Sequence, residues 1–165
     1  MDKSTEERIK LLHPLIRDEV TELVNKANSA TGNAITIRIV QGLRTFPEQD
    51  ELYAQGRTKP GGIVTYAKSG QSYHNYGLAI DFAFLIKDKG EISWDTVKDW
   101  DGDTISDWLE VVKIFVKAGY TWGGTWAGKK RDAPHFEKIF NLNWREMRKR
   151  YDKKDFITGT KYIRI

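Results

Sequence analysis

Apolar residues spaced three and four positions apart predict two helices at the start of the chain. Ser4 followed by Glu7 has the spacing of a capping box, so we expect a short amphipathic helix there. Ile9 and Leu12 would form its apolar face. Pro14 suits the first turn of a second helix, because an N–H group at that position has no partner within the helix. The apolar stripe of this second helix would be Leu15, Ile16, Val20, Leu23, Val24 and Ala27.

Period-two alternation and continuous apolar runs predict the strands. Residues 35–40 alternate, and residues 78–86 are strongly apolar. Shorter strand candidates at 120–122 and 134–139 flank a glycine-rich loop. Helices and strands are mixed without the regular strand–helix–strand rhythm of a parallel sheet. We therefore expect an α+β fold with a small antiparallel sheet flanked by helices.

Thr45 and Glu48 form a second capping box, and Gly56 would end the helix that begins there. Residues 57–73 are polar and contain several glycines. A loop of this length in a compact domain is usually functional or disordered.

Two helices are expected in the second half of the chain. The first covers residues 103–118, and its inward positions would be Ile105, Trp108, Leu109, Val112, Phe115 and Val116. Asn141 or Asn143 would cap the second, which ends near Tyr151.

Composition narrows the class of protein. The 165 residues fit one domain spanning 1–165, with 39% apolar and 30% charged residues, as in folded globular proteins. The chain has no cysteine, which excludes disulfides, cysteine-ligated metals and thiol nucleophiles. No apolar run approaches the roughly 20 residues that cross a bilayer, and the polar N-terminus is not a signal peptide. We therefore expect synthesis in the cytoplasm, unless a signal sequence has been removed, and no membrane insertion.

The net charge of +4 favours polyanions such as nucleic acid, anionic lipid or bacterial wall polymers, but it also fits ordinary surface charge. Six tryptophans suit either a groove lined by rings or a dense core. We expect a monomer without a nucleic-acid partner.

The candidate chemistry centres on Asp81. On the predicted strand its side chain shares a face with two alanines, while the other face is apolar core. A half-buried carboxylate needs a partner. His74 and His135 would complete the two-imidazole, one-carboxylate set that zinc hydrolases use, whereas an ion pair with Arg44 is the alternative.

A zinc hydrolase also needs a general base. Asp132 is the nearest candidate and Glu137 the second. The third histidine, His13, is expected to be a helix cap or a surface residue.

The segment around Asp99, Asp101 and Asp103 is acidic and resembles a calcium loop. Its glycine falls between the second and third acids rather than after the third, and the twelfth position, Glu110, lies inside a predicted helix. A turn in which Asp103 caps that helix is therefore favoured over a Ca²⁺ site.

The two histidine clusters resemble the signature of the VanY-type zinc peptidases. This family includes D-Ala-D-Ala carboxypeptidases, vancomycin-resistance dipeptidases and the L-alanyl-D-glutamate endopeptidases of phage endolysins. The first cluster matches S-x-H-x-x-G-x-A-x-D at Ser72, His74, Gly77, Ala79 and Asp81, and the second matches at Asp132, Pro134, His135, Phe136 and Glu137. Residues 42–58 and the Trp-Gly-Gly-Thr-Trp loop at 122–126 extend the resemblance. The aspartate before Pro-His-Phe and that loop look closest to the endolysin branch.

The resemblance implies a Hedgehog/DD-peptidase-like fold and a role for each matching residue. His74, Asp81 and His135 would bind one zinc ion per chain. Asp132 would act as general base, and Arg44 would stabilise the oxyanion. Ser72, Gln49 and Trp126 would contact or support the substrate, while one of Trp122 and Trp126 would belong to the core.

The expected reaction is hydrolysis of the L-alanyl-D-glutamate bond in peptidoglycan. The alternatives are a D-Ala-D-Ala carboxypeptidase and, in another class, a non-enzymatic wall-binding module with a structural zinc. The absence of a signal peptide favours a phage or prophage lysin that is released to the wall. Lys129, Lys130 and Arg131 would attract carboxylates of the stem peptide, unless they form an ordinary solvated loop.

Overall fold

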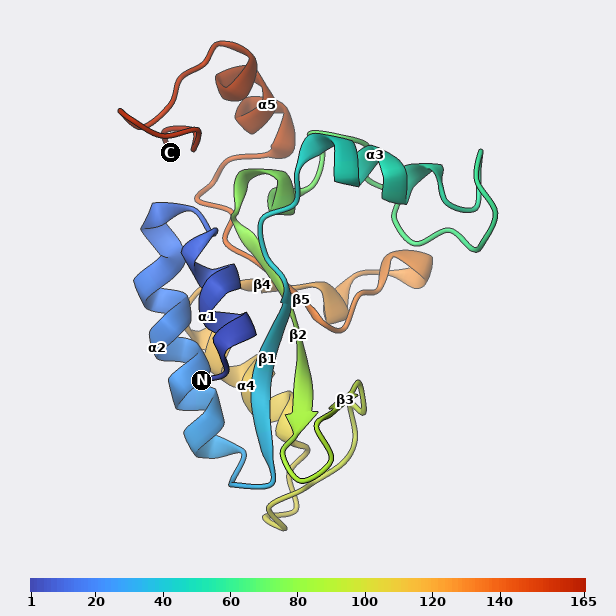
Figure 1. Ribbon diagram of the computed structural model, residues 1–165, viewed down its shortest axis with the longest axis vertical. Helices are drawn as coiled ribbons and strands as arrows, with labels where there is room; N and C mark the ends of the chain where they lie inside the picture. Colours follow the sequence, from blue (N-terminus) through green and yellow to red (C-terminus); the bar gives the residue numbers. More distant parts are fainter.

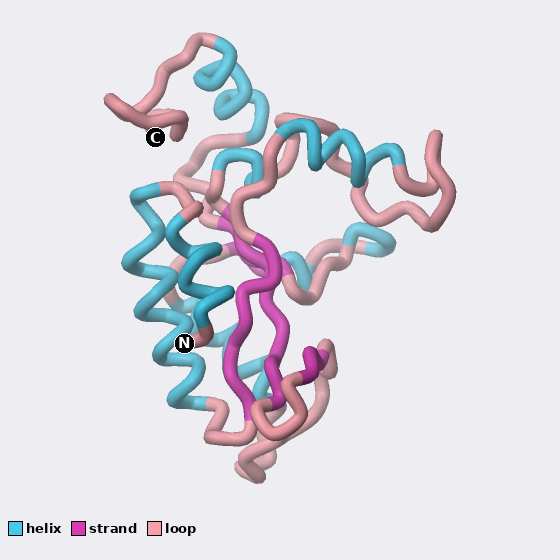
Figure 2. The backbone as a smooth tube through the Cα atoms, in the orientation of Figure 1, coloured by secondary structure: helices cyan, strands magenta, loops and turns pink.

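The computed structural model describes residues 1–165 as an antiparallel sheet with helices packed beside it (Figure 1, Figure 2). The strands are β1 (Ile35–Gln41), β2 (Ala79–Ile86), β3 (Glu91–Ser93), β4 (Thr121–Trp122) and β5 (His135–Glu137). β2 is central: it pairs with β1 along one edge and with β5 and β3 along the other, and β4 pairs with β5. Every pairing is antiparallel, which confirms the expected fold class.

The α-helices are α1 (Lys3–Lys10), α2 (Pro14–Ala30), α3 (Phe46–Ala54), α4 (Asp107–Lys117) and α5 (Trp144–Asp152). Short 3₁₀ turns occur at η1 (Tyr73–Tyr76), η2 (Gly123–Thr125) and η3 (Gly128–Lys130). α1, α2 and α4 lie beside the sheet, whereas α3 and α5 lie beyond its upper end in Figure 1. None of these helices is both long and apolar enough to cross a membrane.

The core lies between the sheet and the helices α1, α2 and α4, and its aromatic part lies between β2 and α4. Trp108 packs against Phe82 and Phe84 with ring centroids 4.2 and 5.4 Å apart, and all three side chains are buried. Phe115 stacks on Phe136 of β5 at 4.7 Å. Burying a large apolar side chain contributes roughly 1.5–3 kcal/mol, so this aromatic cluster fixes α4 against the strand that carries Asp81.

The predicted inward face of α4 is partly wrong. Ile105, Leu109 and Val116 are exposed, and Val111 is buried in their place. The buried stripe follows Trp108, whose contacts with β2 set the rotation of the helix. Asp103 does not cap α4: the helix begins later, at Asp107, and the hydroxyl of Ser106 accepts the capping hydrogen bond from Leu109 N.

The N-terminal cap also differs from the prediction. Asp2, not Ser4, caps α1, because its carboxylate accepts hydrogen bonds from the N–H groups of Ser4 and Thr5. His13 caps α2, which confirms the first of its two expected roles. It is fully buried, so the alternative of a surface residue is wrong. Leu15, expected in the buried stripe of α2, is exposed.

Other expectations are confirmed. Thr45 forms the predicted capping box with Glu48, and Asn143 rather than Asn141 caps α5. Residues 57–73 contain no helix or strand before η1 begins at Tyr73. β3 was not predicted, because it has only three residues and no buried side chain.

Candidate active site

Two strands and one turn bring the predicted ligand residues together. Asp81 of β2 lies directly opposite His135 of β5 in the antiparallel register. His74 lies in η1, and Gly77 with φ 69° ends that turn and directs the chain into β2. A side chain at Gly77 would bring its Cβ within 2.7 Å of the backbone nitrogen of His13, so both the conformation and the packing require glycine.

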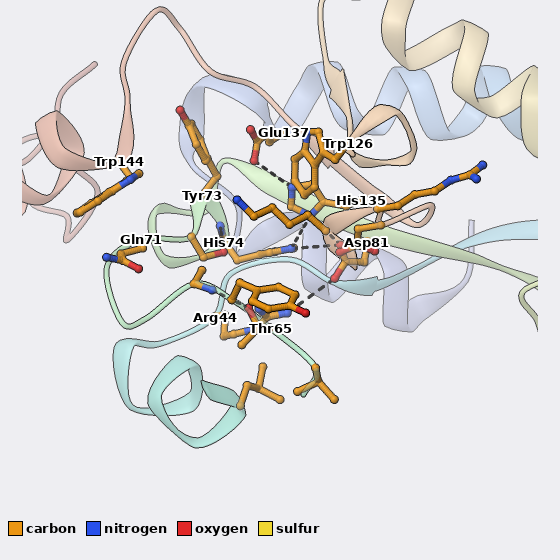
Figure 3. Close-up of a pocket in the computed structure, with 18 of the residues that line it drawn as sticks. Arg44, Thr65, Gln71, Tyr73, His74, Asp81, Trp126, His135, Glu137 and Trp144 are labelled. Carbon is orange, nitrogen blue, oxygen red and sulfur yellow. Dashed lines mark hydrogen bonds and ion pairs between the residues drawn. The ribbon is translucent and has the colours of Figure 1, made fainter. Parts of the chain in front are cut away.

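The three side chains converge on one point (Figure 3). His74 Nε2 lies 3.2 Å from Asp81 Oδ1 and 3.2 Å from His135 Nδ1. His135 Nδ1 lies 3.0 Å from the same Asp81 oxygen. Both imidazoles are buried, and the Asp81 side chain is 18% exposed. The sequence therefore predicted correctly that these three residues meet.

The outer ring nitrogens decide which atoms face the centre. His74 Nδ1 lies 2.7 Å from the Gly42 carbonyl oxygen, which can only accept, so Nδ1 carries the proton. His135 Nε2 lies 3.0 Å from Glu137 Oε2 and donates to it in the same way. The ring protons of the two histidines are therefore placed on these outer nitrogens, because the partner of each is an acceptor. In the neutral rings, two nitrogen lone pairs and a carboxylate oxygen then point at one another with no proton between them. This arrangement suits a cation, and the donor set is one that a divalent metal such as zinc accepts.

The charges agree with this assignment. Burial acts to raise the pKa of Asp81, but the two histidines lower it well below its usual range. Burial acts to lower the pKa of His135, but Asp81 and Glu137 raise it to about 9. The pocket therefore favours positive charge at its centre, either a proton or a metal ion.

Arg44 lies beside these three residues. Its guanidinium is 3.7 Å from Asp81 Oδ2, so the alternative ion pair and the convergent ligand set coexist. Arg44 Nη1 donates to Gln49 Oε1 at 3.1 Å, and Gln49 Nε2 donates to the Ala67 carbonyl at 2.8 Å. Gln49 is fully buried and does not line the cavity. It therefore joins Arg44 to the loop 57–73 instead of facing a ligand.

Asp132 reaches the site from the loop before β5. Its backbone N–H donates to the Gly123 carbonyl at 3.0 Å, and its carbonyl accepts from His135 N at 3.3 Å. Its carboxylate accepts no hydrogen bond from the protein and is open to the cavity. Burial of the carboxyl by neighbouring atoms and the negative charge of Asp81 raise its pKa, against smaller opposing effects of the histidines and Arg44.

The three converging residues, Arg44 and Asp132 all line a cavity of about 780 Å³. Residues 63–67 of the long loop and the basic residues Lys129, Lys130 and Arg131 also line this cavity. The cavity is large enough for several residues of an extended peptide.

Comparison with known proteins agrees with this geometry. The profile of a peptidase family described as D-alanyl-D-alanine carboxypeptidase matches residues 65–138. The peptidoglycan L-alanyl-D-glutamate endopeptidase CwlK of Bacillus subtilis (strain 168) is 52% identical over 130 residues, which are 79% of this chain and 75% of the relative. This chain belongs to the VanY-like peptidase family. The resemblance to this family that the sequence motifs indicated is thereby confirmed, and the protein is a peptidase.

The fold of this VanY-like peptidase has a solved counterpart. The crystal structure of the L-Ala D-Glu endopeptidase ChiX of Serratia marcescens matches with a TM-score of 0.55 and 21% sequence identity, over 86% of this chain and 91% of that chain. At this identity the match shows the shared fold.

Of the remaining predicted residues of the VanY-like site, some line the cavity and one packs against the core. Ser72 lines the cavity and caps η1 by accepting from His74 N at 3.3 Å. The ring of Trp126 lies 5.0 Å from that of His135 and also lines the cavity. Trp122 packs against the core and donates from Nε1 to the Ala133 carbonyl at 2.7 Å.

Sequence reasoning expected the long polar loop 57–73 to wall a groove, but it did not name several of the individual residues that line the cavity. These are Leu52, Ile63, Val64, Thr65, Tyr66, Ala67, Gln71, Tyr73 and Trp144. The length of the loop 57–73 was the available signal for most of them. Trp144 begins α5, and no motif connects it with the site.

Proposed function

We propose that this VanY-like peptidase is a zinc enzyme that hydrolyses the L-alanyl-D-glutamate bond of peptidoglycan stem peptides. The observation that carries the proposal is the convergence of two imidazole lone pairs and a carboxylate oxygen beside an unpaired acid and a half-buried arginine. The bond is proposed by analogy with CwlK, whose name states it and which is 52% identical.

One zinc ion per chain would be held by His74 Nε2, His135 Nδ1 and an oxygen of Asp81. When bound, it supplies Lewis acidity, which makes a water a better nucleophile and polarises the scissile carbonyl. Three protein ligands leave the open position that a catalytic zinc site needs.

Asp132 is the proposed general base. Its carboxylate is free of protein hydrogen bonds and open to the cavity, so it can take a proton from the attacking water and return it to the leaving amine.

Arg44 is the proposed stabiliser of the negative charge that develops on the scissile carbonyl oxygen. Its hydrogen bond to Gln49 fixes the guanidinium before substrate arrives. A preorganised donor of this kind lowers the barrier because it does not need to reorient during the reaction. Ser72 and Trp126 are proposed to shape the substrate groove, and Gln49 to support Arg44.

The proposal is tested by digesting purified peptidoglycan and identifying the new ends by mass spectrometry. The expected product carries N-terminal D-glutamate and leaves L-alanine on the muramic acid. Free D-alanine as the main product would establish the carboxypeptidase activity that the family description names. The Asp132→Asn variant, loaded with zinc and assayed in parallel, should release the product about 10²–10⁴-fold more slowly.

We also propose that residues 1–165 act as one monomeric catalytic domain. The expectation of a phage or prophage lysin remains a prediction, since the matched relative is a bacterial protein.

A further inference from the structure

The cavity of the candidate active site extends beyond the converging ligands toward the start of α5. In Figure 3, Gln71, Tyr73 and Trp144 lie to the left of His74, whereas Asp81 lies to its right. All five residues line the same cavity. The part formed by Gln71, Tyr73 and Trp144 is termed the aromatic end, and it has no part in the chemistry proposed for the zinc centre.

Contacts between η1, α5 and the long loop hold the aromatic end together. The hydroxyl of Tyr73 donates to the Leu142 carbonyl at 2.6 Å, which ties η1 to the segment before α5. Gly70 has φ 78°, and a Cβ at this position would lie 2.7 Å from Nη1 of Arg148 in α5. α5 therefore packs against both η1 and the end of the loop, and the side chains of the aromatic end are held in place by the fold.

The aromatic end offers ring surface and two free hydrogen-bond donors. Gln71 Oε1 accepts from Lys68 N at 3.0 Å, which orients the amide, but Gln71 Nε2 has no partner in the protein. Trp144 Nε1 also has no partner, and neither nitrogen is shielded from solvent. The guanidinium of Arg145 lies 4.4 Å from the centroid of the Trp144 ring and does not line the cavity. This combination suits a ligand that has both an apolar face and acceptor oxygens.

The charge of the lining changes along the cavity. The three side chains of the aromatic end are neutral, whereas the basic loop of Lys129, Lys130 and Arg131 brings three cations to the same cavity. In Figure 1 the orange segment that follows β4 and carries the basic loop lies to the right of the upper end of the sheet, and α5 lies above that end. The cavity therefore has a neutral aromatic end and, in a different direction from the sheet, a basic one.

The proposed substrate has the same asymmetry. On the amino side of the L-alanyl-D-glutamate bond, L-alanine is joined to muramic acid, an uncharged N-acetylated sugar. On the carboxyl side, D-glutamate and the residues that follow it carry free carboxylates. The C–H groups of a sugar ring pack on the negative face of an aromatic ring, and its oxygens accept hydrogen bonds from N–H donors. The sugar therefore matches the aromatic end, and the carboxylates match the basic loop.

We propose that Gln71, Tyr73 and Trp144 form a subsite for the N-acetylmuramyl sugar, so that the stem peptide runs from the aromatic end across the zinc centre to the basic loop. This inference rests on the proposed function, since cleavage next to L-alanine is what places the sugar beside the reacting bond. The sugar does not react, so its contacts are alike in the ground state and the transition state and lower KM more than they raise kcat. Gln71 and Trp144 are thus specificity residues and not catalytic ones.

The test compares two substrates of the zinc-loaded enzyme. One is a muropeptide that carries N-acetylmuramic acid and the complete stem peptide ending in D-Ala-D-Ala, and the other is the same peptide with an acetyl group in place of the sugar. The KM of the wild type should be about tenfold lower for the muropeptide, as one or two net contacts provide. Trp144→Leu removes the ring and its donor and should abolish most of this preference. Gln71→Glu keeps the acceptor for Lys68 N, removes the donor, and should reduce the preference about threefold.

The ratio between the two substrates cancels any general loss of folding or zinc, which would affect both equally. Trp94→Leu is the matched control, because Trp94 is exposed and lies outside the cavity, and it should keep the wild-type preference. The subsite alone is overturned if both substrates are cut at the L-alanyl-D-glutamate bond with equal KM, or if Trp144→Leu keeps the full preference. Release of D-alanine from both substrates with that bond intact overturns the proposed function, and the subsite with it.

Discussion

Glu137 Oε2 lies 3.0 Å from His135 Nε2, on the side of the imidazole opposite to Asp81. The carboxylate thereby holds the ring in the tautomer whose Nδ1 lone pair faces the other ligands. Such outer partners orient a metal-binding histidine and raise its basicity. Glu137 is therefore a positioning residue in this structure, while Asp132, with its free carboxylate, is the better candidate for the base.

Glu137→Gln should weaken zinc binding by about 10–100-fold, the usual effect of losing an outer carboxylate. Competition with a chromophoric chelator measures this directly and does not depend on activity. Asp132→Asn should bind zinc as tightly as the wild type but lose about 10²–10⁴-fold in turnover. If Asp132→Ala stays active while zinc-loaded Glu137→Ala is inactive, the assignment of the base is wrong.

Gln49 should act through Arg44. Removing its amide in Gln49→Ala frees the guanidinium, and we expect kcat/KM to fall about tenfold, the loss of one hydrogen bond to a charged group. Arg44→Ala should lose about 10²–10³-fold, as for an oxyanion donor. Zinc content should stay unchanged in both.

A double-mutant cycle separates support from direct contact. The variant with both Arg44→Ala and Gln49→Ala should be no slower than Arg44→Ala alone. Additive losses in the cycle would mean that Gln49 acts on the substrate independently of Arg44.

The convergence of the three proposed metal ligands was predictable because the motifs that carry them are short and local. His74 and Asp81 lie in one short motif, and His135 lies in a second, so their types and spacing already indicate a shared site. Their convergence needs only that β2 and β5 pair, and the apolar pattern predicted both strands. The function of Glu137 was not predictable, because it depends on which ring nitrogen of His135 faces outward.

The errors arose where several positions satisfied the same pattern. α4 has apolar residues on two overlapping stripes, and periodicity cannot choose between Leu109 and Val111. The contact of Trp108 with Phe82 makes that choice, and it is a tertiary contact. In the same way Asp2 and Ser4 are both capping residues by type, and the ion pair of Asp2 with Arg38 of β1 favours the earlier start.

The Asp2 cap makes stability depend on pH. Burial acts to raise the pKa of Asp2, but the hydrogen bond from Thr5 and the charge of Arg38 prevail and lower it below its ordinary value of 3.8. A lowered carboxyl pKa adds stability that is fully present above 3.8 and is lost as the pH falls through the lowered value. Asp2→Ala should therefore cost about 1 kcal/mol near neutral pH and progressively less below pH 3.8.

Denaturant unfolding at several pH values measures this cost. Ser4→Ala is the matched comparison, since Ser4 is the cap that the sequence pattern suggested. Its effect should be smaller and independent of pH in the acidic range. An equal, pH-independent loss in both variants would contradict the cap at Asp2.

The basic loop should bind substrate without taking part in the chemistry. Lys129, Lys130 and Arg131 line the cavity and are exposed, so they can attract stem-peptide carboxylates through water. Replacing all three by glutamine lowers the net charge from +4 to +1. KM should rise about tenfold while kcat changes little, because such charges bind the ground state and the transition state alike.

Salt and a charge-matched variant complete this test. The rise in KM should shrink at high ionic strength, since exposed charges are screened over about 8 Å at physiological salt and over shorter distances above it. Replacing Lys153, Lys154 and Lys161 by glutamine removes the same three charges from the C-terminal region, outside the cavity wall. That variant should keep the wild-type KM on soluble stem peptide. An equal rise in both variants would show that net charge, and not the basic loop, attracts the substrate; a fall confined to kcat would place the loop in the catalytic step.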